Sequence, residues 1–330
     1  MQKTIYIFSD GSLHRKGNTL CYKTPEGNRF LPVEDIHEIM VFGEVECNKK
    51  LLEFLSQSEI MMHYFNHYGY YMGTFYPREH YNSGFVILKQ AQCYLDEEKR
   101  LNLAKHFVRG AILNIQQVLK YYHKRGAPLG ENIQRLETAE AMIQEINDIS
   151  ELMATEGNAR EIYYGAFDRI LNNPDFTFEK RSRRPPKNNL NTLISFGNSI
   201  LYTIVLSEIY KTHLDPRIGF LHATNFRRFS LNLDVAEIFK PIIIDRLIFT
   251  MIGTRMLSGK DFEKESGGIV LKDKARKRFV EELDKRLRTT IKHRSVGREV
   301  SYRRLIRMEL YKIEKHLMGE KEYKPFVSQW

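Results

Sequence analysis

The segment from Leu214 to Pro241 carries the densest group of side chains that could do chemistry. His222 follows a glycine-containing apolar turn, and Asp234 and Glu237 lie three residues apart in a stretch whose spacing predicts a helix. Carboxylates and an imidazole without thiolates favour a divalent ion, Mg²⁺ or Mn²⁺, and the histidine favours Mn²⁺. The alternative is a hydrogen-bonded histidine beside two solvated acids. Spacing alone does not decide between these interpretations.

Glu156 is a further candidate, on a different predicted helix. Glu156 and Arg160 are four residues apart and therefore share a helix face, so a surface ion pair is the plain explanation. The functional alternative is that Glu156 completes a metal site, since Gly157 next to it leaves room for a bulky ligand. The residues themselves leave both interpretations open.

Basic residues are concentrated in the second half of the chain. Residues 171–330 contain 32 Lys and Arg against 19 Asp and Glu, a net charge of +13, whereas residues 1–170 have a net charge of −3. A segregated positive charge is typical of proteins that bind a polyanion, because each neutralised phosphate releases a counterion. The alternative is a solubilising surface. The charge distribution favours DNA as the partner.

Two basic clusters stand out within this half. One is a loop around Pro185-Pro186, which would present guanidinium groups to phosphates at little cost in ordering entropy. The other follows His222 and would place positive charge beside the proposed metal site. A solvated basic face is the alternative for both. The candidate DNA-binding residues are Arg181, Arg183, Arg184, Lys187, Arg227 and Arg228.

Several classes of protein are excluded. The three cysteines are far apart, so neither a disulfide framework nor a thiolate zinc site is expected. The glycine-rich nucleotide-binding motifs and the GxSxG and HExxH motifs are missing. The apolar stretch from Pro241 is interrupted by Asp245 and Arg246, so we expect no membrane partner and a cytoplasmic location.

The chain must place these residues with two kinds of element. Short β-type runs separated by turn residues fill positions 1–80, which predicts a β-sandwich or compact sheet domain. Apolar residues recur at helical spacing from Phe85 onward, so we expect positions 81–330 to form a helical domain. Within that range we expect one long helix over 231–257, a mobile loop over 261–268 and a basic helical tail over 272–317. The predicted class is α+β, with a β-sandwich followed by a larger all-α domain.

In order along the chain, several segments resemble the CRISPR-associated integrase and endonuclease family of spacer acquisition, Cas1. The resemblance lies in SDGSLHRKGN, LPVEDIHEIMVFG and GYYMGTFYP in the first part, and in TEGNAREIYY, RRPPKNNLNTLISFG, LDPRIGFLH and SLNLDVAEIFKPIIIDRL in the second. Nearly the whole chain is covered. Asn198 and the Asn188-Asn189 pair depart from the pattern.

The resemblance implies a β-sandwich that mediates homodimerisation and a helical catalytic domain that acts on branched and double-stranded DNA. It assigns Glu156, His222 and Glu237 as ligands of Mn²⁺ or Mg²⁺, with Asp234 as a neighbouring catalytic acid. It also implies that a protospacer 3′-hydroxyl attacks a phosphodiester of the repeat array, and that the small partner Cas2 bridges two dimers. Three rivals remain: a stand-alone branched-DNA nuclease, a transposase-like recombinase and a non-catalytic DNA-binding scaffold.

Overall fold

A computed structural model describes residues 3–78, 81, 83–222, 229–265, 267–293 and 297–329. The chain divides into two units. One holds Met1–His80 with Lys272–Asp284, and the other holds Tyr81–Leu271 with Lys285–Trp330. Helix α10 (Asp273–Arg288) therefore begins in the first unit and ends in the second.

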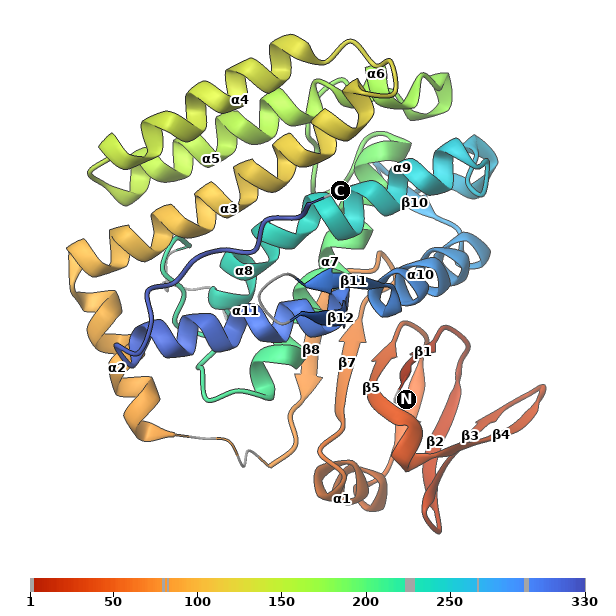
Figure 1. Cartoon of the computed structure of the whole chain (residues 1–330). Coiled ribbons are helices and arrows are strands. Elements are labelled where there is room, and N and C mark those ends of the chain that lie inside the picture. The colour runs from red at the N-terminus through yellow and green to blue at the C-terminus, as the bar shows by residue number, and fades with distance from the viewer. Residues whose placement is uncertain are drawn as a thin grey trace. The chain divides into compact units, whose positions relative to one another are not determined.

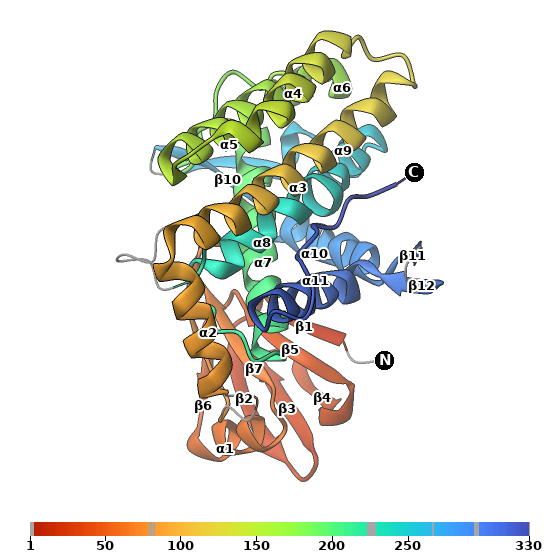
Figure 2. The ribbon, with the colours of Figure 1, turned by 60° about the vertical axis from the view of Figure 1, so that its left-hand side comes forward.

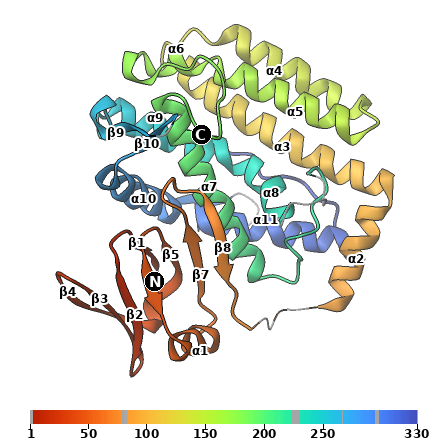
Figure 3. The ribbon, with the colours of Figure 1, turned by 180° about the vertical axis from the view of Figure 1, so that it is seen from behind.

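Two four-stranded sheets build the first unit (Figure 3). In the sheet of order β1-β5-β7-β8, neighbouring strands are parallel except for the last pair. In the sheet of order β4-β3-β2-β6, they are antiparallel except for β2 and β6. The strands are β1 (Lys3–Ile7), β2 (Gly11–Lys16), β3 (Thr19–Thr24), β4 (Gly27–Pro32), β5 (Ile36–Val41), β6 (Val45–Cys47), β7 (Met61–Phe65) and β8 (Tyr71–Phe75).

The two sheets share one hydrophobic core. Leu13 and Leu20 come from one sheet, Ile39 and Met62 from the other, and Phe54 from helix α1 (Lys49–Gln57). Side chains alternate between the faces of a strand, so each sheet directs every second residue into this core. A short 3-10 turn, η1 (Val33–Asp35), precedes β5. The β-sandwich predicted from the strand pattern is confirmed.

The second unit is mostly helical (Figure 1). Its longest helix, α3, packs against α4, α5 and α8, and α8 also packs against α7 (Figure 2). The helices are α2 (Gly84–Leu95), α3 (Glu97–His123), α4 (Gly130–Met142), α5 (Ile149–Tyr164), α6 (Phe167–Leu171), α7 (Asn189–Tyr210), α8 (Leu231–Lys240), α9 (Arg246–Gly253) and α11 (Tyr302–Leu317). Shorter 3-10 turns are η2 (Ile143–Glu145), η3 (Pro174–Phe176) and η5 (Gly259–Asp261).

Two antiparallel hairpins correct the all-α expectation. β9 (Phe262–Glu265) pairs with β10 (Gly268–Leu271), where we expected a mobile loop. β11 (Thr290–His293) pairs with β12 (Arg298–Ser301), inside the expected helical tail. These four-residue strands are too short to show a clear period in sequence, so pairing and tertiary contacts decide their conformation. The α+β class is confirmed, with a second unit that is mostly helical.

The expected long helix over 231–257 contains a π-turn. α8 continues into the π-helical η4 (Pro241–Asp245) and then into α9, which ends at Gly253. Proline has no N–H to donate to the preceding turn, which favours a local change of the helical hydrogen-bond pattern. Within the described residues, one helix, α7, has the length and apolarity to cross a membrane, but 83% of its most apolar window is buried in the protein, as in a core helix.

Candidate functional site

Helices α5 and α8 carry the two predicted glutamates in the second unit. Glu156 lies in the middle of α5, and Glu237 lies near the end of α8. Both helices pack against α3. The start of α5 is fixed by Asp148, whose side chain accepts a hydrogen bond of 2.9 Å from the backbone N–H of Glu151. α3 therefore holds two helices that each present one carboxylate.

The Arg160 guanidinium bridges these carboxylates. Its Nε donates to Glu156 Oε1 at 3.0 Å, and its Nη2 donates to Glu237 Oε2 at 2.5 Å and to the Glu237 carbonyl at 3.0 Å. Arg160 is 7% exposed and Glu237 is 5% exposed. Glu156 and Arg160 are thus paired, as a surface ion pair would be, but Arg160 is buried, Glu156 is half-buried and a second acid joins them.

A second cation, Lys240, completes the cluster. Its Nζ forms a short ion pair with Glu237 Oε1, and it lies 4.8 Å from the centre of the Tyr202 ring. Each oxygen of the Glu237 carboxylate therefore contacts a different cation. Ionised Glu156 and Glu237 are balanced by Arg160 and Lys240, so the four side chains carry no net charge.

Burial and the neighbouring charges separate the two glutamates electrostatically. Burial disfavours the ionised form of Glu237, but Lys240 and Arg160 outweigh it and lower the pKa of Glu237 well below its ordinary value. Burial and the nearby Glu237 charge raise the pKa of Glu156, and Arg160 only partly offsets them. A further cation would therefore stabilise the ionised form of Glu156 more than that of Glu237, which already has two cations in contact.

His222 is oriented by Asp234. The Asp234 carboxylate accepts the His222 Nδ1–H at 2.7 Å and the backbone N–H groups of Phe220, Leu221 and His222 at 2.5 to 3.1 Å. Burial would lower the pKa of His222, but the hydrogen bond and charge of Asp234 raise it above its ordinary value. Gly219 permits this turn, because a Cβ there would lie 2.8 Å from Asp234 Oδ2.

These contacts change the role expected of Asp234. Its two oxygens already accept four hydrogen bonds and the residue is fully buried, so it acts on His222 as a positioning residue. When the ring is neutral and its Nδ1–H donates to Asp234, the His222 Nε2 has a lone pair for another partner. A carboxylate behind an imidazole is the usual support for a metal-binding histidine.

The three candidate ligands have the right chemistry for a divalent ion, but Arg160 bridges two of them. Glu156 and Glu237 offer carboxylate oxygens and His222 offers a ring nitrogen, a set that suits Mg²⁺ or Mn²⁺. Across residues 3–78, 81, 83–222, 229–265, 267–293 and 297–329, however, no three His, Cys, Asp or Glu side chains are grouped around a common ion position. The Arg160 guanidinium bridges the carboxylates instead. The three-ligand metal site stays a prediction.

Three features of this region were not predicted from the sequence. Arg160 is buried, Lys240 pairs with Glu237, and Asp245 lies near both cations. Asp245 is 1% exposed, and burial raises its pKa to about 6, with Arg160 and Lys240 opposing the increase. The spacing of Glu237 and Lys240, three residues apart on one helix, was a usable signal. No spacing rule indicates that Arg160 would reach a second helix.

The predicted DNA-binding loop is exposed but anchored. Arg183, Arg184 and Lys187 are exposed side chains. The Pro186 carbonyl accepts a hydrogen bond of 2.9 Å from Ile269 in β10, and Pro185 packs so closely on Gly268 that a Cβ there would lie 2.5 Å from it. The hairpin β9–β10 thus fixes the loop that presents the basic groups.

Arg181 differs from its neighbours in this loop. Its guanidinium is half-buried and donates to the side chains of Asn191 and Ser195 on α7, at 2.9 and 3.0 Å. Arg181 is therefore committed to holding the loop on α7, and its role in DNA contact stays a prediction. Arg227 and Arg228 lie outside the described residues.

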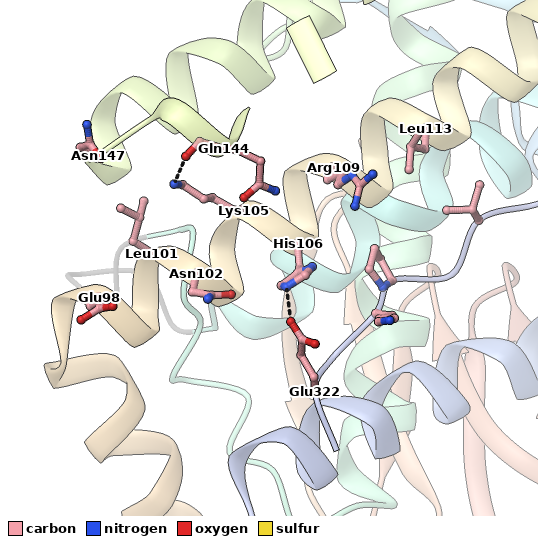
Figure 4. A pocket seen from close by; sticks show the side chains of 13 residues that line it. Glu98, Leu101, Asn102, Lys105, His106, Arg109, Leu113, Gln144, Asn147 and Glu322 are labelled. Carbon is pink, nitrogen blue, oxygen red and sulfur yellow. Dashed lines mark hydrogen bonds and ion pairs between the residues drawn. The ribbon is translucent and has the colours of Figure 1, made fainter. Parts of the chain in front are cut away.

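A separate groove of about 690 Å³ lies along α3 and the carboxyl-terminal segment (Figure 4). Lys105, His106 and Arg109 line it from α3, and Glu322 lies 3.9 Å from His106 across it. None of the predicted site residues lines this groove. Its mixed charge does not select one class of ligand.

The β-sandwich and the mostly helical unit match the fold of one class of protein, the CRISPR-associated Cas1 proteins. The family described as CRISPR associated protein Cas1 matches residues 5–285. The chain belongs to the Cas1 family, as its segments indicated.

Relatives and solved structures agree. A CRISPR-associated endonuclease Cas1 of Thermodesulfovibrio yellowstonii is 60% identical over 330 residues, covering 100% of both chains. The solved structure of a CAS1 protein from Thermotoga maritima has a TM-score of 0.88 at 50% identity, covering 99% of this chain and 100% of that one.

Two more distant structures share the fold. A casposase bound to an integration product has a TM-score of 0.88 at 21% identity, with 99% of this chain and 94% of that chain covered. A chain of a Cas6-RT-Cas1–Cas2 complex has a TM-score of 0.86 at 20% identity, with 100% of this chain and 36% of that chain covered.

Proposed function

We propose that this protein is a divalent-metal-dependent DNA endonuclease and integrase of CRISPR adaptation. In the integration reaction, a protospacer 3′-hydroxyl attacks a phosphodiester of the repeat array. A new 3′-oxygen–phosphorus bond forms, and the old bond breaks to leave a 3′-hydroxyl on the target strand. The observations that support the proposal are the Arg160-bridged pair of Glu156 and Glu237 and the Asp234-oriented His222, whose charge acts on Glu237, in a chain of the Cas1 family.

The residues of the cluster have separable tasks. Glu156, Glu237 and the Nε2 of His222 would hold Mn²⁺ or Mg²⁺, which when bound supplies a Lewis acid for the scissile phosphate and favours ionisation of the attacking hydroxyl. Asp234 keeps the His222 ring in one orientation and keeps the proton on Nδ1. Arg160 and Lys240 provide positive charge beside the position at which negative charge develops.

The proposal includes the partners that the family resemblance implies. The protein would act in the cytoplasm as a homodimer on branched and double-stranded DNA, and a small Cas2 partner would bring two dimers together. The relative from Thermodesulfovibrio yellowstonii is named an endonuclease, and fold neighbours are described with an integration product and with Cas2. The net charge of +13 over residues 171–330 supports a DNA partner independently.

A joining assay tests this function. A donor duplex with free 3′-hydroxyls, a matching 3′-deoxy donor and a repeat-containing target are incubated with the protein, Cas2 and Mn²⁺ or Mg²⁺. Glu156→Gln should lower the joining rate at least about 100-fold, because ion stabilisation of such a reaction is worth several kcal/mol. Glu161→Gln, at an exposed position of the same helix, is the matched control and should retain joining.

The donor ends separate integration from its rivals. The 3′-deoxy donor should bind the protein normally but should form no joined product. Equal product from both donors would exclude transesterification and leave a stand-alone nuclease. Unchanged cleavage and joining in Glu156→Gln would overturn the assigned site. A wild-type protein that binds the DNA but neither cleaves nor joins it would leave the non-catalytic DNA-binding scaffold.

A further inference from the structure

Arg160 contacts both of the glutamates that are proposed as ligands of the ion. It uses Nε on Glu156 and Nη2 on Glu237, so it touches both carboxylates that are assigned to the ion. Its Nη1 is buried and, within the described part of the chain, has no hydrogen-bond partner. Among the described residues, the guanidinium therefore makes hydrogen bonds only to Glu156 and Glu237, including the Glu237 carbonyl.

Lys240 pairs with one of these two glutamates and not with both. It pairs with Glu237, and the Tyr202 ring lies against its ammonium group at 4.8 Å. Lys240 therefore has a second favourable contact when the Glu237 carboxylate is shared with an ion. Arg160 has no corresponding aromatic contact among the described residues, and its position between two acids is the one that a bridging cation would take.

This geometry has an electrostatic consequence for ion binding. The ionised side chains of Glu156, Glu237, Arg160 and Lys240 carry no net charge together, so a divalent ion would add two positive charges beside two buried cations. Repulsion between like charges is strong where water is excluded. A nearby phosphodiester would relieve it, because its negative charge gives the cations a new partner.

We propose that Arg160 is an internal counter-ion that closes the metal site in the free protein, so that the divalent ion and a DNA phosphate bind cooperatively. The inference rests on the proposed function and adds a control on when the site is loaded. Because linkage is reciprocal, DNA must tighten ion binding by the same factor as the ion tightens DNA binding. Ion loading and chemistry would then be confined to DNA-bound protein.

Direct measurement of ion affinity tests the proposal. Free Mn²⁺ is followed by electron paramagnetic resonance while full-length protein is titrated, with and without a duplex ending in 3′-deoxy nucleotides that cannot be joined. For the wild type, the duplex should increase Mn²⁺ affinity at least about 10-fold, a coupling in the usual range for linked sites. Arg160→Gln should bind Mn²⁺ at least about 10-fold more tightly than wild type without DNA, and the duplex should add less than about 3-fold.

Two further variants keep the result interpretable. Arg160→Lys keeps the charge but cannot bridge both acids with a planar fork, so its Mn²⁺ affinity without DNA should lie between those of wild type and Arg160→Gln. Arg109→Gln removes an arginine that pairs with Glu140 at 2.6 Å elsewhere in the same unit, and should behave as wild type. Melting temperatures establish that each variant is folded.

The outcomes distinguish this inference from the proposed function. Mn²⁺ affinity that is equal with and without DNA in the wild type, or no tighter in Arg160→Gln and Arg160→Lys, overturns the counter-ion role. Joining could still require Glu156 in that case, and the proposed function would stand. Full Mn²⁺ binding by Glu156→Gln in every condition would instead overturn the metal site itself.

Discussion

Asp234 is a residue whose structural role can be measured directly. Its charge and hydrogen bond raise the pKa of His222, whereas burial lowers it. Asp234→Asn removes the charge, so we expect the His222 pKa to fall by about one unit or more, the usual scale for losing an opposite charge in contact. Titration of the histidine ring signals by NMR would measure this change. The burial-lowered pKa of His106 should stay unchanged as an internal control, and an unaltered His222 pKa would contradict the assignment.

The two predicted ligands should differ in their effect on stability. Glu237→Ala leaves Arg160 and Lys240 buried without their shared carboxylate, and breaking such buried pairs costs about 3–5 kcal/mol. Glu156→Ala removes an acid whose pKa is raised and leaves Arg160 paired with Glu237, so it should cost much less. Denaturant unfolding of both variants at pH 7 tests the order. Equal losses of stability would show that Glu237 does not hold the two cations.

At the residue scale, the sequence predicted which acids and histidine to examine but not how they are satisfied. His222, Asp234 and Glu237 were candidates from residue type and spacing, and Glu156 from its place beside Gly157. The family resemblance then assigned Glu156, His222 and Glu237 as ligands. The partners of Arg160 did not follow, because a glutamate and arginine four residues apart look the same on a surface and in a core. Burial depends on which helix packs alongside, and that is set by tertiary structure.

At the scale of elements, the carboxyl-terminal segment that follows α11 is bound to α8, the helix that carries Glu237. Asn114 on α3 donates to the carbonyls of Ile238 in α8 and of Phe326, at 3.1 and 2.8 Å, and accepts from the Ser328 N–H at 2.8 Å. The Phe326 ring also stacks on Phe239, with centroids 5.9 Å apart. The last residues of the described chain therefore hold the position of α8.

Loss of this fastening should loosen both segments together. Asn114→Ala leaves buried backbone groups unpaired, at about 1–3 kcal/mol for each group. We expect a lower melting temperature and faster hydrogen exchange in the carboxyl-terminal segment and in α8. Asn102→Ala, at an exposed position of the same helix, is the control and should change neither measurement. Unchanged exchange in α8 would show that the segment does not support it.

The elements that the sequence misjudged are those fixed by distant contacts. Residues 261–268 contain charged and glycine residues and look like a loop, yet β10 is held by the Ile269 N–H bond to Pro186. The expected continuous helix changes at Pro241, where the backbone lacks a donor. Long apolar segments such as α3 and α7 were predictable, because one buried face of α3 leaves a repeated pattern and α7 is apolar along most of its length.

At the scale of the whole molecule, the segregated charge should appear in the salt dependence of DNA binding. Each phosphate contact steepens the logarithmic dependence of affinity on salt by about 0.9 for duplex DNA. Arg183, Arg184 and Lys187 are exposed on a loop that β10 anchors, so they can meet phosphates without rearrangement of the fold. Their replacement by glutamine should lower affinity for all duplex sequences alike.

The slope distinguishes these groups from a merely solvated basic surface. If all three contact phosphate, the triple variant should reduce the magnitude of the slope by about 2 to 3, measured by fluorescence anisotropy across a salt series. A control with the same charge change replaces the exposed Lys3, Lys23 and Lys50 of the first unit by glutamine and should leave the slope nearly unchanged, because the net charge of residues 1–170 is already −3. Both variants lose three positive charges, so a difference between them reports position and not total charge. Identical slopes for wild type and both variants would assign DNA binding to other parts of the chain.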